Sequence, residues 1–280
     1  MSEMDTVAGH YSHGGLLAAI EAGVRALGKT PETVTVDDLG PVDEFHIGGR
    51  QASEAFLGQL RFEPTDQVLD IGCGLGGTAR FVADRFGCQV TGIDLTGDYI
   101  ETGQALCGWL GLNGQVRLDQ GSALAMPYGV DSFDRAFMMH VGMNIADKKL
   151  LFSEVYRVLK PGGMFGLYDV MRGTLDGFVY PVPWTSTAEA NWVAPSADYE
   201  TALAAAGFRI AANRNRRQFA IEFFASLRAA NAAANGPPPL GLHILMGKSA
   251  AQKVGNLVAN IQEGRVAPVE MIAQKPELDP

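Results

Sequence analysis

The chain has 280 residues, of which 47% are hydrophobic and 19% are charged. These proportions are typical of one large globular domain, or of one domain with an elaborated cap. The formal net charge of −9 offers no basic face, which excludes nucleic acid as an expected partner.

The cysteines and the hydropathy pattern exclude several further classes. Cys73, Cys88 and Cys107 are odd in number and far apart in sequence, which favours neither a disulfide framework nor a zinc site. No secretory signal follows the acidic N-terminus, and no stretch approaches the ~18 apolar residues of a membrane span. We therefore expect a cytoplasmic monomer or homodimer with no metal and no membrane or nucleic-acid partner.

The first 60 residues are predicted to form a helical cap. An apolar stripe predicts a helix over residues 16–27, which Gly28 ends. One helical turn is expected around residues 36–39, and a second helix over about 51–60. Between them lies an unusual polar and glycine-containing string, Val42-Asp-Glu-Phe-His-Ile-Gly-Gly-Arg50.

From Gln67 the sequence alternates between strand and helix patterns. Strands are expected at residues 67–71, 88–93, 115–119, 134–140 and 163–170, and helices at 76–86, 97–110 and 147–159. Such alternation predicts a parallel sheet with helices on both faces. Ligands of such sheets bind outside the carboxyl ends of the strands.

The remainder of the chain is less regular. Residues 172–197 read as a long functional loop. Helices are expected at residues 197–206, 218–230 and 250–261, and strands at 208–212 and 266–273, with Pro268 indicating an edge position for the last strand. We expect an α/β Rossmann-like fold with a seven-stranded, mostly parallel sheet, its last strand antiparallel. The core is predicted to span residues 61–280, with a cap or lid insertion at about 172–250.

The stretch after the first strand predicts a nucleotide-like ligand. Gly72, Gly74 and Gly77 satisfy the pattern G-x-G-x-x-G, and Asp94 ends the next strand about 20 residues further on. This pattern is typical of NAD-linked oxidoreductases, which remain an alternative. However, the carboxylate of Asp70 would lie beside the turn, where it would repel a pyrophosphate and suit a ligand that carries an ammonium and a sulfonium.

Four ordered motifs resemble those of the class I S-adenosylmethionine-dependent methyltransferases. They are Val68-Leu-Asp-Ile-Gly-Cys-Gly-Leu-Gly-Gly77, Thr91-Gly-Ile-Asp-Leu-Thr96, Ser132-Phe-Asp134 and Leu159-Lys-Pro-Gly-Gly163. The string Asp43-Glu-Phe-His-Ile-Gly-Gly49 resembles the sarcosine/dimethylglycine methyltransferase-like branch of small-molecule enzymes.

The resemblance implies a cofactor, S-adenosyl-L-methionine, and a product, S-adenosyl-L-homocysteine. Asp70 and the backbone of the glycine turn would hold the methionine portion, and Asp94 would accept both ribose hydroxyls. Leu95 would lie on the adenine face. The full predicted cofactor set is Asp70, Gly72, Cys73, Gly74, Asp94, Leu95, Ser122, Ala123, His140, Tyr11 and His46.

The predicted reaction is methyl transfer to a small molecule. The acceptor is either an amine, such as a methylated glycine, or the hydroxyl or carbon of a natural product. A hydroxyl acceptor needs a general base, for which His140 is the candidate because the pKa of a histidine lies near neutrality. Substrate contacts are expected from Met143, Asn144, Arg172, Trp184 and Phe223. A cofactor-binding protein without catalysis is a further alternative.

Overall fold

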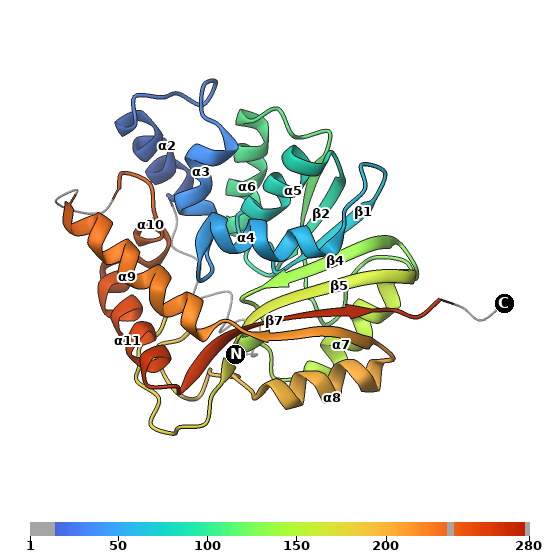
Figure 1. The fold of residues 1–280 in the computed structure, drawn as a ribbon. Helices are drawn as coiled ribbons and strands as arrows, with labels where there is room; N and C mark the ends of the chain where they lie inside the picture. The colour runs from blue at the N-terminus through green and yellow to red at the C-terminus, as the bar shows by residue number, and fades with distance from the viewer. Residues whose placement is uncertain (1–14, 234–237, 278–280) are drawn as a thin grey trace.

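The computed structural model describes residues 15–233 and 238–277, which form one seven-stranded sheet with the order β3-β2-β1-β4-β5-β7-β6 (Figure 1). The strands are β1 (Gln67–Ile71), β2 (Gln89–Asp94), β3 (Val116–Gln120), β4 (Phe133–Met139), β5 (Leu159–Arg172), β6 (Arg209–Asn215) and β7 (Val266–Gln274). The pairs among β1 to β5 are parallel, and β7 pairs antiparallel with both β5 and β6. The predicted mostly parallel sheet with an antiparallel last strand is confirmed.

Helices cover both faces of the sheet because its central strands are apolar on both sides. In β1, four of the five residues are buried, as parallel strands require. The helices of the alternating region are α5 (Gly77–Phe86), α6 (Gly97–Trp109) and α7 (Lys148–Val158). The helix α8 (Ser196–Ala206) packs beside α7, on the face of the sheet opposite to α5 (Figure 1).

Within residues 15–66, three helices precede the first strand. They are α2 (Leu16–Ala26), α3 (Val36–Asp43) and α4 (Gly49–Leu57), and the last of them continues as a 3-10 turn over Gly58–Leu60. The expected single turn near residue 36 is in fact the two-turn helix α3. A capping box starts it, because the Thr35 side chain accepts from the Asp38 N–H while Asp38 accepts from the Thr35 N–H. The division of the chain at residue 60 stays a prediction.

A second group of helices lies at the end of the sheet from which β7 starts. It contains α9 (Arg217–Ala233), α10 (His243–Met246) and α11 (Ala250–Gln262), with a 3-10 turn over Gly247–Ser249. Figure 1 shows these helices beside α2 and α3, and α10 contacts α2 directly. The four-residue α10 escaped prediction because one turn is too short to show helical periodicity. Among the described residues, no helix is long and apolar enough to cross a membrane.

The expected edge position of β7 is wrong. The strand lies between β5 and β6, with Pro268 opposite Val170 of β5. Proline is tolerated there because its carbonyl accepts from the N–H of Arg216, just beyond the last β6 pair. The N–H and C=O of one residue point to the same side of a strand, so an N–H at Pro268 would also face β6. Because β6 has already ended at that point, the missing N–H removes no hydrogen bond between the two strands.

The glycines of the turn after β1 serve two different purposes. Gly72, Gly74 and Gly76 have φ values of 69°, 55° and 74°, which favour glycine. Gly77 does not adopt positive φ. A Cβ on Gly77 would lie 2.3 Å from the Cβ of Asp43, so this glycine is required by the close approach of α3 to α5.

We predict that Gly77→Ala separates α3 from α5 and destabilises the protein by about 1–3 kcal/mol or more, the cost of overpacking a core contact. The measurement is the urea unfolding midpoint. Gly255→Ala is the matched control, because it lies in α11 with nothing within 4 Å of the added Cβ and should stabilise by ~0.5–1 kcal/mol. Equal stability of Gly77→Ala and the native chain would contradict the packing argument.

Candidate active site

A cavity of about 1220 Å³ opens at the carboxyl ends of the parallel strands. Its walls come from the strand ends, from the string between α3 and α4, and from the α9–α11 group. The predicted site residues that line it are Asp70, Gly72, Cys73, Gly74, Asp94, Leu95, Ser122, Ala123, His140, His46, Met143, Asn144, Trp184 and Phe223. The structure therefore brings together side chains that are far apart in sequence.

Two predicted residues are not brought to this cavity. Arg172 lies outside its lining, where the guanidinium donates to the carbonyl of Val193 at 3.0 Å. The long loop after β5 returns to lie beside the end of that strand, and the hydrogen bond from Arg172 holds the loop in this position. The expected pairing of Arg172 with substrate is therefore not supported. Tyr11 lies outside the described residues.

The glycine turn is bound to the end of β2. The N–H groups of Gly72 and Cys73 both donate to the carbonyl of Ile93, at 2.8 and 3.1 Å. A Cβ on Gly72 would lie 2.3 Å from Val141, so a larger residue does not fit. The turn leads into the N-terminus of α5, which directs the positive end of its helix dipole toward the turn.

Asp94 braces the same turn. One carboxylate oxygen accepts from the Gly74 N–H at 3.0 Å, and the other accepts from the Thr96 N–H at 2.8 Å. Thr96 precedes α6 but makes no capping bond with its side chain within the described structure. Burial raises the pKa of Asp94. Each oxygen has a second lone pair, so the carboxylate can still accept from two hydroxyls.

Asp70 is a buried carboxylate, and one of its two oxygens lacks a donor. Its residue is 3% exposed, and its Oδ2 has no hydrogen-bond partner among the residues that the structure describes. Burial, followed by the neighbouring charge of Asp94, raises the pKa of Asp70 well above its usual value. A cationic group bound beside this carboxylate would oppose both effects on its pKa. The two buried carboxylates at the turn therefore fit a ligand that carries an ammonium group.

Ser122 and Ala123, two of the predicted cofactor residues, lie in a turn after β3. The Ser122 hydroxyl accepts from the Leu124 N–H at 3.1 Å, which fixes the turn. Its own hydrogen is then directed away from that bond.

The described part of the chain offers no metal site. Within these ranges, no group of three or more His, Cys, Asp and Glu side chains could hold an ion.

His140 follows β4 in a left-handed conformation with φ 58°. Its Nδ1 lies 3.2 Å from the carbonyl of Tyr168, and its Nε2 accepts from the Ile47 N–H at 3.3 Å. A carbonyl only accepts, so Nδ1 carries the proton and Nε2 is already used. Part of the ring faces the cavity, but protein encloses the rest, and this burial lowers the pKa of His140 to about 3.

The expected near-neutral pKa of His140 is therefore wrong. A base with a pKa of about 3 and both nitrogens bonded to backbone is poorly placed to take a proton at pH 7. Its geometry instead connects the end of β4 and the middle of β5 to Ile47. The catalytic role of His140 stays a prediction.

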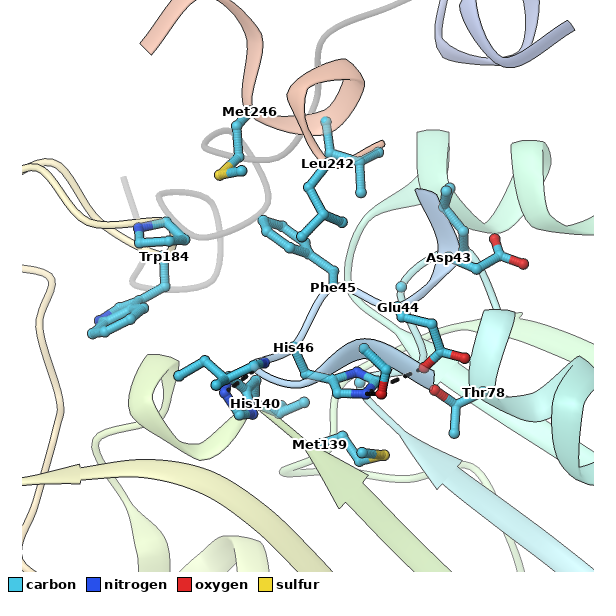
Figure 2. Close-up of a pocket in the computed structure, with 18 of the residues that line it drawn as sticks. Asp43, Glu44, Phe45, His46, Thr78, Met139, His140, Trp184, Leu242 and Met246 are labelled. Atoms are coloured by element: carbon cyan, nitrogen blue, oxygen red, sulfur yellow. Dashed lines mark hydrogen bonds and ion pairs between the residues drawn. The ribbon is translucent and has the colours of Figure 1, made fainter. Parts of the chain in front are cut away.

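His46 lies beside His140, with 6.1 Å between ring centroids (Figure 2). Its Nε2 approaches the Gly49 carbonyl at 3.2 Å, the Ser53 hydroxyl at 3.0 Å and the Glu44 carboxylate at 3.2 Å. Burial lowers the pKa of His46, and the charge of Glu44 opposes that effect. The neutral imidazole is the form present at pH 7.

Several lining residues were missed from the sequence. Among the labelled side chains of Figure 2, these are Asp43, Glu44, Phe45, Thr78, Leu242 and Met246. The available signal was the unusual polar string between α3 and α4, in which two adjacent acidic residues stand among apolar residues and glycines. Leu242 and Met246 carried no signal, because their segment has no periodic pattern.

The far wall of the cavity is apolar and aromatic. Trp184 is 4% exposed, and its indole N–H donates to the Asn191 side chain at 3.0 Å. Phe223 packs against Phe224 with ring centroids 5.4 Å apart. The α9–α11 group and the segment before α10 form the lid of the cavity. Its other apolar lining residues include Leu227, Leu242, Leu245, Met246, Val254 and Leu257.

Comparison with known proteins assigns the central region. Residues 68–163 match the family described as a methyltransferase domain. This central part of the chain is therefore similar to a methyltransferase domain. The match spans the glycine turn, Asp94 and the start of β5, which are the same motifs that the sequence singled out.

Three individual proteins illustrate the similarity. Methyltransferase GfsG of Streptomyces halstedii is 32% identical over 140 residues, which cover 50% of each chain. Geranyl diphosphate C-methyltransferase of Streptomyces coelicolor A3(2) aligns structurally with a TM-score of 0.70 and 19% identity over 98% of both chains. A protein described as a sarcosine dimethylglycine methyltransferase of Galdieria sulphuraria aligns with a TM-score of 0.61 and 19% identity, over 81% of this chain and 84% of that one. The chain spans half or less of the length of the curated relatives it matches first.

The NAD-linked alternative gains no support. Dinucleotide-binding sheets have the order 3-2-1-4-5-6, whereas here β7 is inserted antiparallel between β5 and β6. The orphaned Asp70 carboxylate at the turn also disfavours a pyrophosphate.

We predict that His140→Asn reduces the acid sensitivity of the fold. The folded-state pKa is lowered from 6.5 to about 3, so the unfolded chain binds the proton more readily and native stability is lost as pH falls from 6.5 towards 3. Each pH unit contributes at most about 1.4 kcal/mol. Urea unfolding between pH 7.5 and 4 measures the difference between variant and native chain. Asparagine tolerates the left-handed backbone, and parallel pH profiles for the two proteins would contradict the assignment.

Proposed function

We propose that this protein transfers a methyl group from S-adenosylmethionine to a bulky, largely apolar small molecule and releases S-adenosylhomocysteine. The observation that carries the proposal is that one cavity joins the glycine turn to the apolar lid. The methyltransferase family match to residues 68–163 supports the same reaction class.

The residues present fit this cofactor. Asp70 would accept from the ammonium group, and Gly72, Cys73 and Gly74 would offer backbone to the methionine portion. Asp94 would accept from the ribose hydroxyls. On the adenine side, the predicted contacts are Leu95, Ser122 and Ala123. When bound, the cofactor supplies a methyl group already activated by a sulfonium, so the protein mainly aligns the acceptor and excludes water.

The cavity favours an apolar acceptor over a methylated glycine. Pockets for a single small ligand have volumes of about 300–1,000 Å³, and the 1220 Å³ found here suits a cofactor together with a second sizeable molecule. Trp184, Phe223 and Met246 line the same cavity as the glycine turn. The carboxylate of a glycine derivative would need a cation. Of the two cationic side chains in the lining, Arg50 and Lys248, Arg50 is already paired with Glu44 at 3.1 Å.

Among the acceptor classes, this lining favours the hydroxyl or carbon of an apolar natural product. The contacts expected from Met143, Asn144, Trp184 and Phe223 are proposed on the basis of their position in the cavity lining. The acidic net charge of −9 disfavours nucleic acid as a substrate. Cytoplasmic location and a monomeric or homodimeric state stay predictions.

The cofactor assignment predicts that Asp94→Asn and Asp70→Asn each weaken S-adenosylhomocysteine binding by roughly ten-fold or more, because a hydrogen bond to a charged group contributes about 1.5–3 kcal/mol. Isothermal titration calorimetry measures the affinity. Asp84→Asn is the matched control, because Asp84 is exposed on α5 and outside the cavity. Unchanged affinity in both site variants, or a higher melting temperature with NAD than with S-adenosylhomocysteine, would contradict the proposal.

The acceptor assignment predicts that Leu242→Trp reduces methylation of apolar probes by about ten-fold while S-adenosylhomocysteine affinity stays the same. The added ring would fill the lid side of the cavity. The measurement is methyl transfer from labelled S-adenosylmethionine to squalene, a long-chain alkylphenol and sarcosine. Leu175→Trp is the control, because Leu175 is exposed and lies outside the lining. A clear preference of the native protein for sarcosine would contradict the apolar assignment.

A further inference from the structure

The proposed function leaves a proton to be removed. A hydroxyl or carbon acceptor loses a proton when it is methylated. Both ring nitrogens of His140 are bonded to backbone, so the candidate base from the sequence is poorly placed. A second histidine, His46, lines the same cavity.

The contacts of His46 fix which ring nitrogen carries the proton. Nε2 lies 3.2 Å from the Gly49 carbonyl, which can only accept, and 3.2 Å from the Glu44 carboxylate. Nε2 must therefore carry the hydrogen, which leaves a lone pair on Nδ1. Nδ1 has no hydrogen-bond partner in the described parts of the chain. Polar atoms there that lack both a hydrogen-bond partner and accessible surface do not include Nδ1. Nδ1 therefore keeps some accessible surface, which faces the cavity.

Two further side chains orient this imidazole. The Ser53 hydroxyl donates to Glu44 Oε2 at 2.5 Å and lies 3.0 Å from His46 Nε2, where its oxygen can accept. The side chain of Glu44 is only 2% exposed, and Arg50 pairs with its other oxygen at 3.1 Å. Figure 2 shows Glu44 on the side of His46 away from His140. The chain His46–Ser53–Glu44 therefore holds the ring and can stabilise a positive charge on it.

We propose that His46 is the proton acceptor of the reaction, with Ser53 and Glu44 as positioning residues. This inference rests on the proposed function. An acceptor electron pair forms the new bond to the methyl carbon, and the S–CH3 bonding pair stays on sulfur. The acceptor's O–H or C–H bond breaks, and its proton joins the Nδ1 lone pair before release to solvent.

The simpler alternative is that His46 only packs, or only contacts the cofactor. The groups that face it are Glu44, Arg50, His140 and the ring of Tyr168, the last with centroids 6.3 Å apart. A packing or cofactor role does not require an open Nδ1, and a proton acceptor does. The accessibility and tautomer of His46 therefore separate the two readings without any acceptor.

The first test uses the full-length protein without acceptor. Nitrogen-15 correlation spectra at pH 7 should show His46 as the neutral Nε2–H tautomer. Diethyl pyrocarbonate, which attacks an unprotonated imidazole nitrogen, should modify His46 faster than His140, as read by peptide mass spectrometry. Glu44→Gln removes the charge that raises the pKa of His46, so the pH midpoint of His46 modification should move to lower pH. An Nδ1–H tautomer, or a His46 that stays unmodified while His140 reacts, would overturn the proposal.

The second test separates this inference from the cofactor assignment. His46→Gln should keep S-adenosylhomocysteine affinity within a few-fold, and lower alkylphenol methylation by roughly 10²–10⁴-fold. Glu44→Gln should lower it less and shift its acid limb to lower pH. Glu222→Gln, on the exposed side of α9, is the control. If the native protein fails to bind S-adenosylhomocysteine, the proposed function is wrong. If His46→Gln binds S-adenosylhomocysteine normally and methylates the alkylphenol as fast as the native protein, only the proposed role of His46 is wrong.

Discussion

The architecture of the site depends on one buried ion pair, between Asp43 and Arg80. The two side chains are completely buried, and their charged atoms lie 2.7 Å apart. Arg80 also donates to the carbonyls of Leu75 and Gly103, at 2.6 and 3.2 Å. Removing one partner of such a pair costs about 3–5 kcal/mol, because it leaves a buried charge unpaired. The pair therefore ties the end of α3 to α5 and α6 at a defined position beneath the glycine turn.

This tie determines where the polar string after α3 lies. Glu44 and His46 follow Asp43 directly, so they are carried over the carboxyl ends of β1 and β4. Ile47 then bonds to His140, which follows β4, and to Tyr168 of β5. Its N–H donates to His140, and its carbonyl accepts from the Tyr168 hydroxyl at 3.1 Å. The cap is consequently part of the site rather than a cover laid over it.

The cap also meets the α9–α11 group and closes the cavity from above. Leu240 and Leu245 pack in one apolar cluster with Ile20 and Val24 of α2. Gly23 is needed at this contact, because a Cβ there would lie 2.5 Å from Leu240. The cavity that results has an acidic floor at Asp70 and Asp94 and an apolar roof. This contrast suits a cationic cofactor below and an apolar acceptor above.

The sequence by itself determined the alternation of strands and helices, the glycine turn and the positions of Asp70 and Asp94. Those features are local, since strand periodicity, turn glycines and the spacing between successive strand ends are written in consecutive residues. Only the tertiary structure decided the place of β7 inside the sheet, the reason for Gly77, and the protonation of the two histidines. Each of these depends on a contact between distant segments: Pro268 with Arg216, Gly77 with Asp43, His140 with Ile47 and Tyr168. The pKa of an imidazole is set by such surroundings, so the shift from the expected near-neutral value to about 3 in His140 became visible only in the folded chain.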